Sequence, residues 1–291
     1  MAITATRPVV DVRSITDADL RVVGEFLQAN LNARVPVDDW VHALDSPWSD
    51  RPNAGVMLLD GEQLVGVHLA FYSERLIDGR LERFCNLGAW CVLPEYRFHA
   101  VKLLKALLAQ DGYHFTDLSP SGNVVGINTR LGFRSLDTSI SLVPNLPWPS
   151  WPGRAVISSD RAVIERTLTG RDLALYRDHA TARGARHLVL KRGDEWCYVV
   201  FRKDRRKKLP LFASILHVSN PGLYREMARP LGRHLLLRHG VAATLAEDRV
   251  VKQRPRLSFR LHNPRPKMFL SPDLEPDQVD YFYSELVRLA W

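Results

Sequence analysis

The sequence of 291 residues is poor in cysteine, with three in all. Cys85 and Cys91 fall on one expected strand, where six residues of extended chain separate them by about 20 Å, beyond disulfide distance. The first residues, "MAITATRPVVDV", lack a cationic start followed by an apolar core, so no secretory leader is expected. These two absences predict reduced thiols in a cytoplasmic protein.

Several motifs that carry chemistry are also missing. There is no Cys-x-x-Cys or His-Glu-x-x-His spacing, no Walker A loop, no dinucleotide fingerprint and no Gly-x-Ser-x-Gly elbow. No apolar run is long enough to span a bilayer. The sequence therefore predicts no metal site and no transmembrane segment, and it counts against ATP, NAD and serine-hydrolase chemistry.

Charge is distributed unevenly along the chain. Residues 1–150 hold 13 Lys and Arg against 17 Asp and Glu, a net charge of −4, while residues 151–291 hold 27 against 15, a net charge of +12. The basic runs are "RKDRRKK" at 202–208 and "KQRPRLSFRLHNPRPK" at 252–267. The first run is interpreted as an exposed hairpin tip, with a clamp for an anionic ligand as the alternative. Nucleic acid is a less favoured partner.

Four prolines and two tryptophans mark a boundary in "VPNLPWPSWPGR", residues 143–154. Proline fixes the backbone and removes donors, so this stretch is neither a helix nor a central strand. We expect one domain over 1–146, a linker over 147–154 and a second domain over 155–291.

Both halves show a similar order of expected elements. In the first half, a strand and two helices precede three strands over 55–93, which hairpin turns at Asp60-Gly61 and Asp78-Gly79 connect. A helix, a strand, a helix and a last strand follow in turn. In the second half, a helical stretch over 160–183 precedes three strands, a helix, another strand and a final helix over 276–291. The repeated order predicts two copies of one mixed α/β fold in tandem.

The stretch "WCVLPEYRFHAVKLLKALL", residues 90–108, joins a strand to an amphipathic helix. Apolar residues recur at Ala100, Leu103, Leu104, Leu107 and Leu108, the spacing of one helical face. A helix N-terminus can bind phosphate through its N–H groups. No glycine follows Pro94 here, so Lys102 would have to add charge where a close backbone approach is missing.

The first half resembles the GNAT superfamily of acyl-CoA N-acyltransferases. The resemblance is carried by the strand and turn "VLPEYR" (92–97), by "TRLGF" (129–133) and by the order of strands and helices from Val9 to Val143. The sequence departs from the family's Arg/Gln-x-x-Gly-x-Gly/Ala, because Ala100 and Lys102 stand at the two glycine positions. It implies two domains in tandem, each with a twisted, mostly antiparallel sheet flanked by helices, the second copy degenerate. The second half lacks the turn motif, since the corresponding place reads "HVSNPGLYREMARPL".

The resemblance also implies where an acetyl-CoA or other acyl-CoA would bind. The fourth and fifth strands would splay, and the pantetheine arm would pair with the backbone of the fourth. The implied cofactor-binding residues are Trp90, Cys91, Val92, Arg97, Phe98, His99, Ala100, Val101, Lys102 and Asn128.

Catalysis requires a base that takes a proton from the attacking amine. The candidates are Glu82 and Asn86 on the fourth strand and Asp117 on the fifth, each with a competing structural interpretation. Asn128 stands at the position of the family's acidic tyrosine and cannot replace it.

The sequence is thus interpreted as an acyl-CoA-dependent N-acyltransferase with a small amine or amino sugar as acceptor, and a homodimer is one option for its assembly. Two alternatives stay open. One is a Fem-type transferase that uses aminoacyl-tRNA, and the other is an inactive acyl-CoA-binding or scaffold protein.

Overall fold

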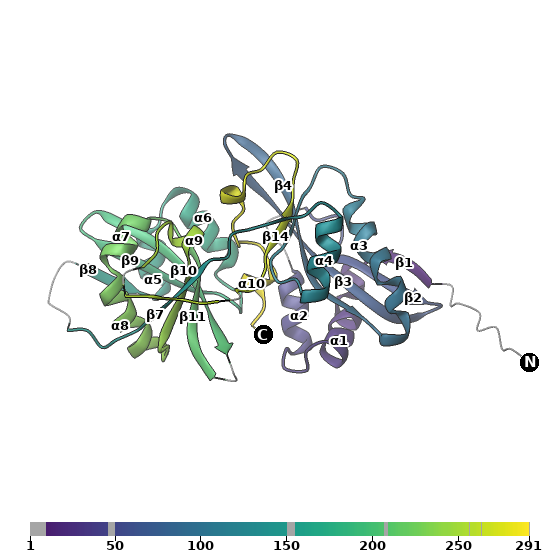
Figure 1. Cartoon of the computed structure of the whole chain (residues 1–291), viewed down its shortest axis with the longest axis horizontal. Coiled ribbons are helices and arrows are strands. Elements are labelled where there is room, and N and C mark those ends of the chain that lie inside the picture. The colour runs from purple at the N-terminus through teal and green to yellow at the C-terminus, as the bar shows by residue number, and fades with distance from the viewer. Residues whose placement is uncertain are drawn as a thin grey trace, which may run out of the picture. The chain divides into compact units, whose positions relative to one another are not determined.

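The computed structural model describes residues 10–45, 50–149, 155–206, 209–255, 257–262 and 264–290. The chain divides into two compact units (Figure 1). Unit 1 is the chain up to Leu118 with Leu270–Pro272, and unit 2 contains Ser119–Phe269 and Asp273–Ala290. The expected linker over 147–154 stays a prediction, and its residues 150–154 lie outside the described part.

Unit 1 follows the expected order of elements as far as the strand over 114–117, and the helix and strand expected after it lie in unit 2. Its sheet has the strand order β1-β2-β3-β4-β5, antiparallel except for the parallel pair β4 and β5. The elements are β1 (Val10–Ser14), η1 (Asp17–Asp19), α1 (Leu20–Asn30), α2 (Val37–Leu44), β2 (Gly55–Asp60), β3 (Gln63–Ile77), β4 (Arg80–Val92), η2 (Pro94–His99), α3 (Ala100–Leu108) and β5 (His114–Asp117).

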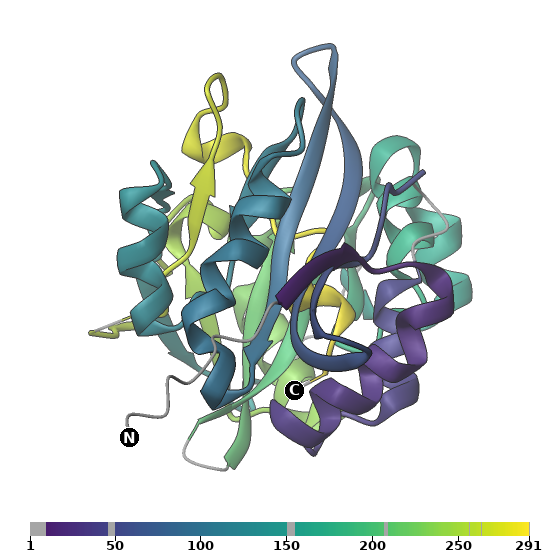
Figure 2. The same cartoon turned by 90° about the vertical axis from the view of Figure 1, so that its right-hand side faces the viewer.

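Two tight turns connect the central strands of unit 1, as the sequence predicts. Gly61 joins β2 to β3, and Asp78-Gly79 joins β3 to β4, all three with positive φ. Glycine and aspartate tolerate this left-handed backbone better than other residues. The β3–β4 hairpin is long, and Figure 2 shows its tip projecting past the other strands of this sheet.

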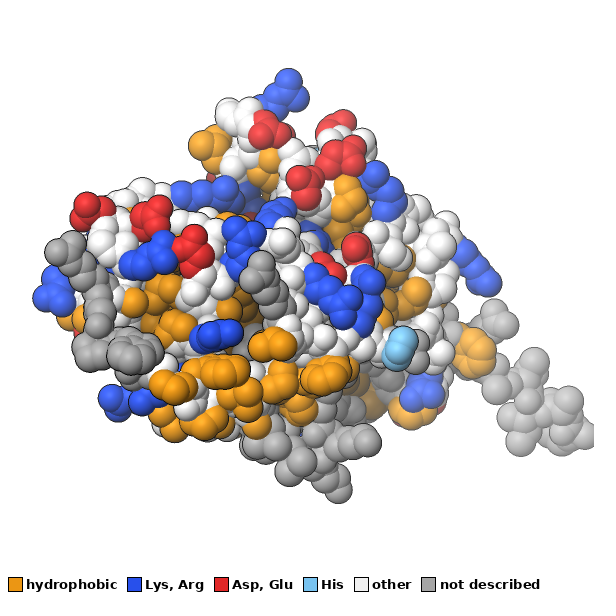
Figure 3. Space-filling model, turned by 60° about the vertical axis from the view of Figure 1, so that its left-hand side comes forward, with side chains coloured by type: hydrophobic (Ala, Val, Ile, Leu, Met, Phe, Trp, Pro, Cys, Tyr) orange, Lys and Arg blue, Asp and Glu red, His pale blue; other side chains and the backbone are white. Residues whose placement is uncertain are grey.

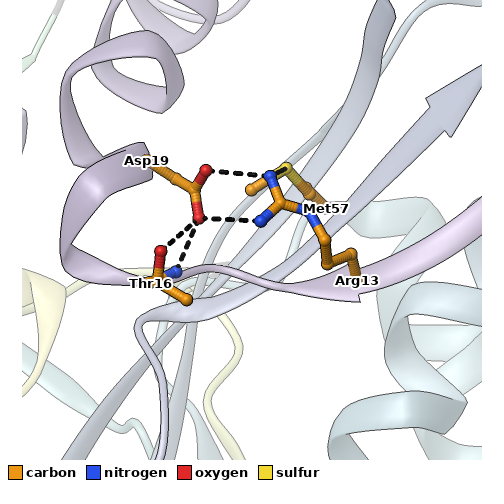
Figure 4. Close-up of polar contacts among 4 residues, drawn as sticks. All are labelled: Arg13, Thr16, Asp19 and Met57. Atoms are coloured by element: carbon orange, nitrogen blue, oxygen red, sulfur yellow. Dashed lines mark hydrogen bonds and ion pairs between the residues drawn. The ribbon is translucent and has the colours of Figure 1, made fainter. Parts of the chain in front are cut away.

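The start of the first helical segment is fixed by one carboxylate (Figure 4). Asp19 accepts hydrogen bonds from the Thr16 N–H at 2.9 Å, from the Thr16 hydroxyl at 2.6 Å and from the Arg13 guanidinium at 2.8 Å. Burial raises the pKa of Asp19, but the hydrogen bonds from Thr16 and Arg13 together have the larger effect and hold the pKa below its ordinary value. The segment "TDAD" therefore begins the helical turn that leads into α1.

Unit 2 repeats the pattern around a sheet of order β13-β7-β12-β11-β10-β9-β8. Only β11 and β12 are parallel neighbours in it. A short pair, β14 with β6, is antiparallel. The elements are α4 (Gly122–Arg130), β6 (Arg134–Ser135), β7 (Ile140–Pro144), β8 (Ala155–Ser158), α5 (Arg161–Thr167), α6 (Gly170–His179), β9 (Arg186–Arg192), β10 (Glu195–Arg206), β11 (Leu209–Val218), α7 (Pro221–Glu226), α8 (Ala228–His239), β12 (Ala243–Glu247), α9 (Asp248–Val251), β13 (Phe259–Arg260), β14 (Met268–Leu270), η3 (Pro276–Gln278) and α10 (Glu285–Arg288).

Both units contain a strand that is antiparallel to one neighbour and parallel to the other. In unit 1 this strand is β4, between β3 and β5, and in unit 2 it is β11, between β10 and β12. Each is followed by a helical segment that begins at a proline. The tandem of two mixed sheets expected from the repeated element order is confirmed.

Two helix predictions for unit 2 are wrong. The helical stretch over 160–183 is two helices, because the backbone is extended at Leu168 and Thr169. The expected last helix shrinks to η3 and α10, since the stretch from Tyr281 to Leu289 is buried along its whole length rather than along one face. Arg202, the first residue of the basic run 202–208, is buried on β10 and pairs with Asp204 at 3.1 Å, so this residue does not belong to an exposed tip. The last two residues of the run lie outside the described part, and the hairpin tip stays a prediction.

Candidate functional site

The central feature of unit 1 is the point where β4 and β5 stop pairing. Their parallel register joins Phe84 to His114, Cys85 to Phe115 and Asn86 to Thr116, and it ends there. β5 ends one residue later, at Asp117, whereas β4 continues to Val92. The second half of β4 therefore runs on beyond the last residue that pairs with β5.

A β-bulge coincides with this point. Along the β3–β4 ladder, His68 faces Trp90 but Ala70 faces Leu87, so β4 holds one extra residue between them. Bulges bend a strand and increase its twist. Gly88 lies in the bulge, and a Cβ atom there would come within 2.5 Å of the Phe71 ring. The close approach of this ring leaves no room for a side chain at residue 88.

The segment after β4 is fastened back to the sheet. The Leu93 N–H donates to the Val65 carbonyl at 2.9 Å, and the Tyr96 hydroxyl donates to the Asp60 carboxylate at 2.6 Å. Pro94 begins the 3-10 turn, where its missing N–H is no loss. The motif "PEY" thus holds the turn against the end of β2.

The side chains that the sequence assigns to phosphate face solvent. Arg97, Val101 and Lys102 are exposed, and Phe98 is 94% exposed. The backbone differs from a simple helix start, because the 3-10 turn runs directly into α3 and the Ala100 N–H donates to the Arg97 carbonyl. Fewer free N–H groups remain at this point than the sequence suggests, and positive charge becomes the main attraction for an anion.

The two cysteine thiols of β4 are neutral at neutral pH. Burial raises the pKa of the Cys91 thiol, against a smaller opposing effect of Arg97, and raises that of Cys85 to about 12. All three cysteines are free and buried. Neither of these two thiols is activated as a nucleophile, which agrees with their interpretation as small apolar residues.

The three candidate bases occupy different places. Glu82 lies at the start of β4, and its carboxylate is 3.0 Å from the His114 imidazole. Nine residues, or about 30 Å of strand, separate it from Cys91. Asn86 is buried and donates from Nδ2 to Thr116, at 3.2 Å to the carbonyl and 3.0 Å to the hydroxyl, so it closes the last rung of the β4–β5 ladder.

Asp117 is the candidate carboxylate that lies nearest to the end of the β4–β5 register. It is the last residue of β5, one position past Thr116, and its side chain is buried. Asn86 also leaves one polar atom there, because its Oδ1 is buried with no partner among the described residues. The structure thus brings Asn86 and Asp117 to the end of the ladder and leaves Glu82 at its beginning.

The closing motif "TRLGF" belongs to unit 2. The Phe133 N–H donates to the Asn128 carbonyl at 3.0 Å, and Gly132 has φ +92°, the arrangement that ends a helix with a left-handed glycine. Asn128 is fully buried on α4.

A contact that the sequence does not predict joins α10 to the segment that leaves β5. The Ser119 hydroxyl donates to the fully buried Glu285 carboxylate at 2.6 Å. The two residues are 166 positions apart, and the charged residues of "SELVRLA" give no sequence signal of burial. Ser119 follows Asp117 by two residues, so the contact fixes the chain just past β5.

The described residues contain neither a metal-binding cluster nor a membrane-spanning helix. No group of three or more His, Cys, Asp or Glu side chains lies close enough to hold a metal ion. Within the same residues, no helix has the length and apolar character needed to cross a membrane.

Comparison with solved structures identifies the fold. A GCN5-related N-acetyltransferase from Anabaena variabilis superposes with a TM-score of 0.59 over 90% of this chain and 72% of its own, at 10% sequence identity. Another from Kribbella flavida gives a TM-score of 0.57 over 92% and 72%, at 14% identity. A GCN5-related glucosamine N-acetyltransferase region of a fungal multi-domain β-N-acetylglucosaminidase gives 0.55 over 91% of this chain and 38% of that one, at 12% identity.

The chain therefore has the fold of the GCN5-related N-acetyltransferases, the GNAT superfamily, with two tandem units. No family model matches the sequence. One curated protein, "Probable terpene synthase 12" of Ricinus communis, is 34% identical over 116 residues, which are 37% of this chain and 19% of that protein. The match spans about a fifth of that relative, and it assigns no activity to this chain.

Proposed function

We propose that the protein transfers an acetyl or other short acyl group from acyl-CoA to an amine. The observation that supports this most is the end of the β4–β5 register at Asn86 and Thr116, with β4 continuing to Val92. Backbone N–H and C=O groups of a strand without a partner bind an extended polar chain. A pantetheine arm, with its two amide groups, is such a chain.

The turn after β4 supplies the charge for the diphosphate of the cofactor. Arg97, His99 and Lys102 lie within six residues, and neither Arg97 nor Lys102 is buried. We assign Trp90, Cys91 and Val92 to the pantetheine through their backbone. The Phe98, Ala100 and Val101 side chains would flank the phosphates, and Asn128 stays a predicted contact.

The reaction requires the amine nitrogen to attack the thioester carbonyl. The new C–N bond forms as the C–S bond breaks, and a base takes the proton that the amine loses. The CoA sulfur leaves as a thiolate and becomes the thiol when it receives a proton from the protonated base or from water. Asp117 is the favoured base because it ends β5 beside the last rung, while the Glu82 carboxylate is held by His114 at the far end of β4. A backbone N–H near Cys91 or Val92 would stabilise the oxyanion.

The acceptor we favour is an amino sugar. One of the similar structures is described as a glucosamine N-acetyltransferase region. Because the sequence identity to it is 12%, this likeness supports the fold and only suggests the acceptor. On the face that Figure 3 shows, Lys and Arg side chains are interspersed with Asp and Glu, which does not favour a broad nucleic-acid surface.

The test is a two-part assay with the full chain. Titration calorimetry measures acetyl-CoA binding, and release of the free CoA thiol is followed with glucosamine and a panel of small amines. We expect saturable binding and amine-dependent thiol release. Binding without release over the whole panel would support the inactive acyl-CoA-binding alternative, and the absence of binding would refute the proposal.

A further inference from the structure

Unit 2 contains a hollow of about 450 Å³ that the transfer reaction does not use. Three elements surround it: the beginning of α6, the beginning of β10, and the turn from β11 into α7. Its lining residues are Thr169, Arg171, Asp172, Trp196, Ser219, Asn220 and Pro221. We call it the Trp196 hollow.

The hollow occupies a place that has a counterpart in unit 1. Ser219, Asn220 and Pro221 follow β11, the strand that pairs in parallel with β12, just as the turn at Leu93 and Pro94 follows β4. The repeat of the fold has therefore produced a second concave site after its central parallel strand, where ligands of open α/β sheets usually bind.

The chemistry of this second site suits a diphosphate poorly. Pro221 has no N–H, and the Leu223 N–H is already bonded to Asn220 Oδ1 at 3.0 Å, so the turn offers few donors to phosphate oxygens. Asp172 adds a carboxylate to the wall, and burial raises its pKa against the opposing hydrogen bond from Ser219. A second acyl-CoA would meet the Asp172 carboxylate beside the Arg171 guanidinium, so the hollow offers its diphosphate less net positive charge than the turn of unit 1 does.

The groups that remain suit a polar ring with one apolar face. Trp196 is half-buried and gives the hollow an aromatic wall. Around it stand the Asp172 carboxylate, the Arg171 guanidinium and the Asn220 amide. Arg171 is largely exposed and only loosely paired with Asp280, at 3.8 Å, so its donors can reach a ligand. A sugar hydroxyl can donate a hydrogen bond to a carboxylate and at the same time accept one from a guanidinium or an amide N–H.

We propose that the Trp196 hollow binds a pyranose sugar. The C–H face of the ring would lie against the Trp196 indole, and ring hydroxyls would bond to Asp172, Arg171 and Asn220. Ser219 positions the carboxylate, because its oxygen accepts the Tyr198 N–H at 2.8 Å while its hydroxyl contacts Asp172. Sugar binding at this hollow is separate from acyl-CoA binding in unit 1 and requires no cofactor.

The test is titration calorimetry of the full chain with glucose, glucosamine and N-acetylglucosamine, without CoA. We expect at least one sugar to bind, and we expect Trp196→Ala and Asp172→Asn each to weaken its binding by about tenfold or more. Trp148→Ala is the matched control, since Trp148 is another partly exposed tryptophan of unit 2 and lines no part of the hollow. It should leave binding unchanged.

Two further variants separate the loss of sugar binding from a loss of folding and from the loss of acetyl-CoA binding. If Trp196→Ala lowers the unfolding midpoint, Trp196→Phe keeps an aromatic wall and should bind more weakly than the native chain but more tightly than a protein without the ring. Lys102→Glu, which should weaken acetyl-CoA binding, should leave sugar binding intact and so separates this proposal from the transfer function. Absence of binding by all three sugars, or equal binding by the Trp196 and Trp148 variants, would overturn the proposal.

Discussion

The imidazole of His68 stacks on the indole of Trp90, with ring centroids 4.6 Å apart and planes inclined by 5°. The two residues face each other across β3 and β4, next to the bulge at Gly88. His68 is buried, and its Nδ1 has no partner among the described residues. Burial lowers the pKa of His68 to about 3, so the ring stays neutral at neutral pH and the stack is an apolar support for the end of β4.

This pKa predicts how stability depends on pH. Between pH 6.5 and about 3, His68 is protonated in the unfolded chain but neutral in the folded one. The contribution of the neutral His68 to stability is therefore complete above pH 6.5 and decreases as the pH falls below that value. We expect His68 to account for about 2 kcal/mol of the stability lost between pH 7 and pH 5. Urea unfolding at both pH values should show this difference shrink in His68→Phe. The exposed His262 is the control, since His262→Phe should leave the difference unchanged.

The cations of the turn should control acyl-CoA binding. We expect Lys102→Glu to weaken acetyl-CoA binding by about tenfold or more, because it reverses a charge beside the proposed diphosphate, and the loss should shrink at high salt. Calorimetry at two salt concentrations measures both effects. Lys105→Glu, an exposed residue at the end of α3, is the matched control and should bind nearly as the native chain does.

Ala100 stands at one of the two glycine positions of the GNAT motif, so restoring glycine there tests for tighter rather than weaker acetyl-CoA binding. Ala100→Gly removes a methyl group at the start of α3 and allows a closer backbone approach to phosphate. We expect acetyl-CoA binding to tighten or stay equal, while the free energy of unfolding falls by about 1 kcal/mol because glycine destabilises a helix. A marked loss of binding with the fold intact would contradict the assigned place of the phosphates.

The bulge should tolerate no larger residue at its centre. In Gly88→Val the new side chain would meet the Phe71 ring, since even a Cβ atom would lie 2.5 Å from it. We expect a loss of about 1–3 kcal/mol in stability from such overpacking, measured by urea unfolding. The double variant Gly88→Val with Phe71→Leu should be more stable than Gly88→Val alone, because the smaller leucine side chain leaves room beside residue 88. No gain in stability over Gly88→Val would show that the Phe71 ring is not the obstacle.

The Asp19 carboxylate supports the entry into α1. Asp19→Asn keeps the size of the side chain but weakens the bonds from Thr16 and Arg13, and we expect a loss of about 1–2 kcal/mol. Because the folded pKa of Asp19 lies below its ordinary value, its contribution is present above about pH 4 and disappears as the pH falls further. The native chain and the variant should therefore approach each other in stability at acidic pH. A constant difference would contradict the carboxylate's role.

The sequence predicted the elements that local patterns determine. Strand alternation and the turns at Gly61 and Asp78-Gly79 were enough for the β2–β3–β4 ladder, and the amphipathic run after Pro94 was enough for α3. The last helix was mispredicted because the stretch from Tyr281 to Leu289 is buried on all sides, and a helical period cannot be recognised in a segment that has no exposed face.

The candidate site could be predicted only in part. The turn residues 94–102 came from their resemblance to the GNAT motif, and the splay of the fourth and fifth strands that it implied stays a prediction. The bulge at Gly88 depends on the packing of Phe71, which lies 17 residues away, and no local pattern reveals it. The hydrogen bond from Tyr96 to Asp60 and that from Ser119 to Glu285 are likewise tertiary contacts between distant segments.

The most direct measurement is amide hydrogen exchange of the peptide that covers residues 87–93, with and without saturating acetyl-CoA. Our account predicts that exchange of these amides slows when the cofactor binds, because its pantetheine arm takes the place of a neighbouring strand beside β4, and that peptides of β9 do not change. Unchanged exchange over residues 87–93 under conditions where calorimetry shows acetyl-CoA bound would contradict the account.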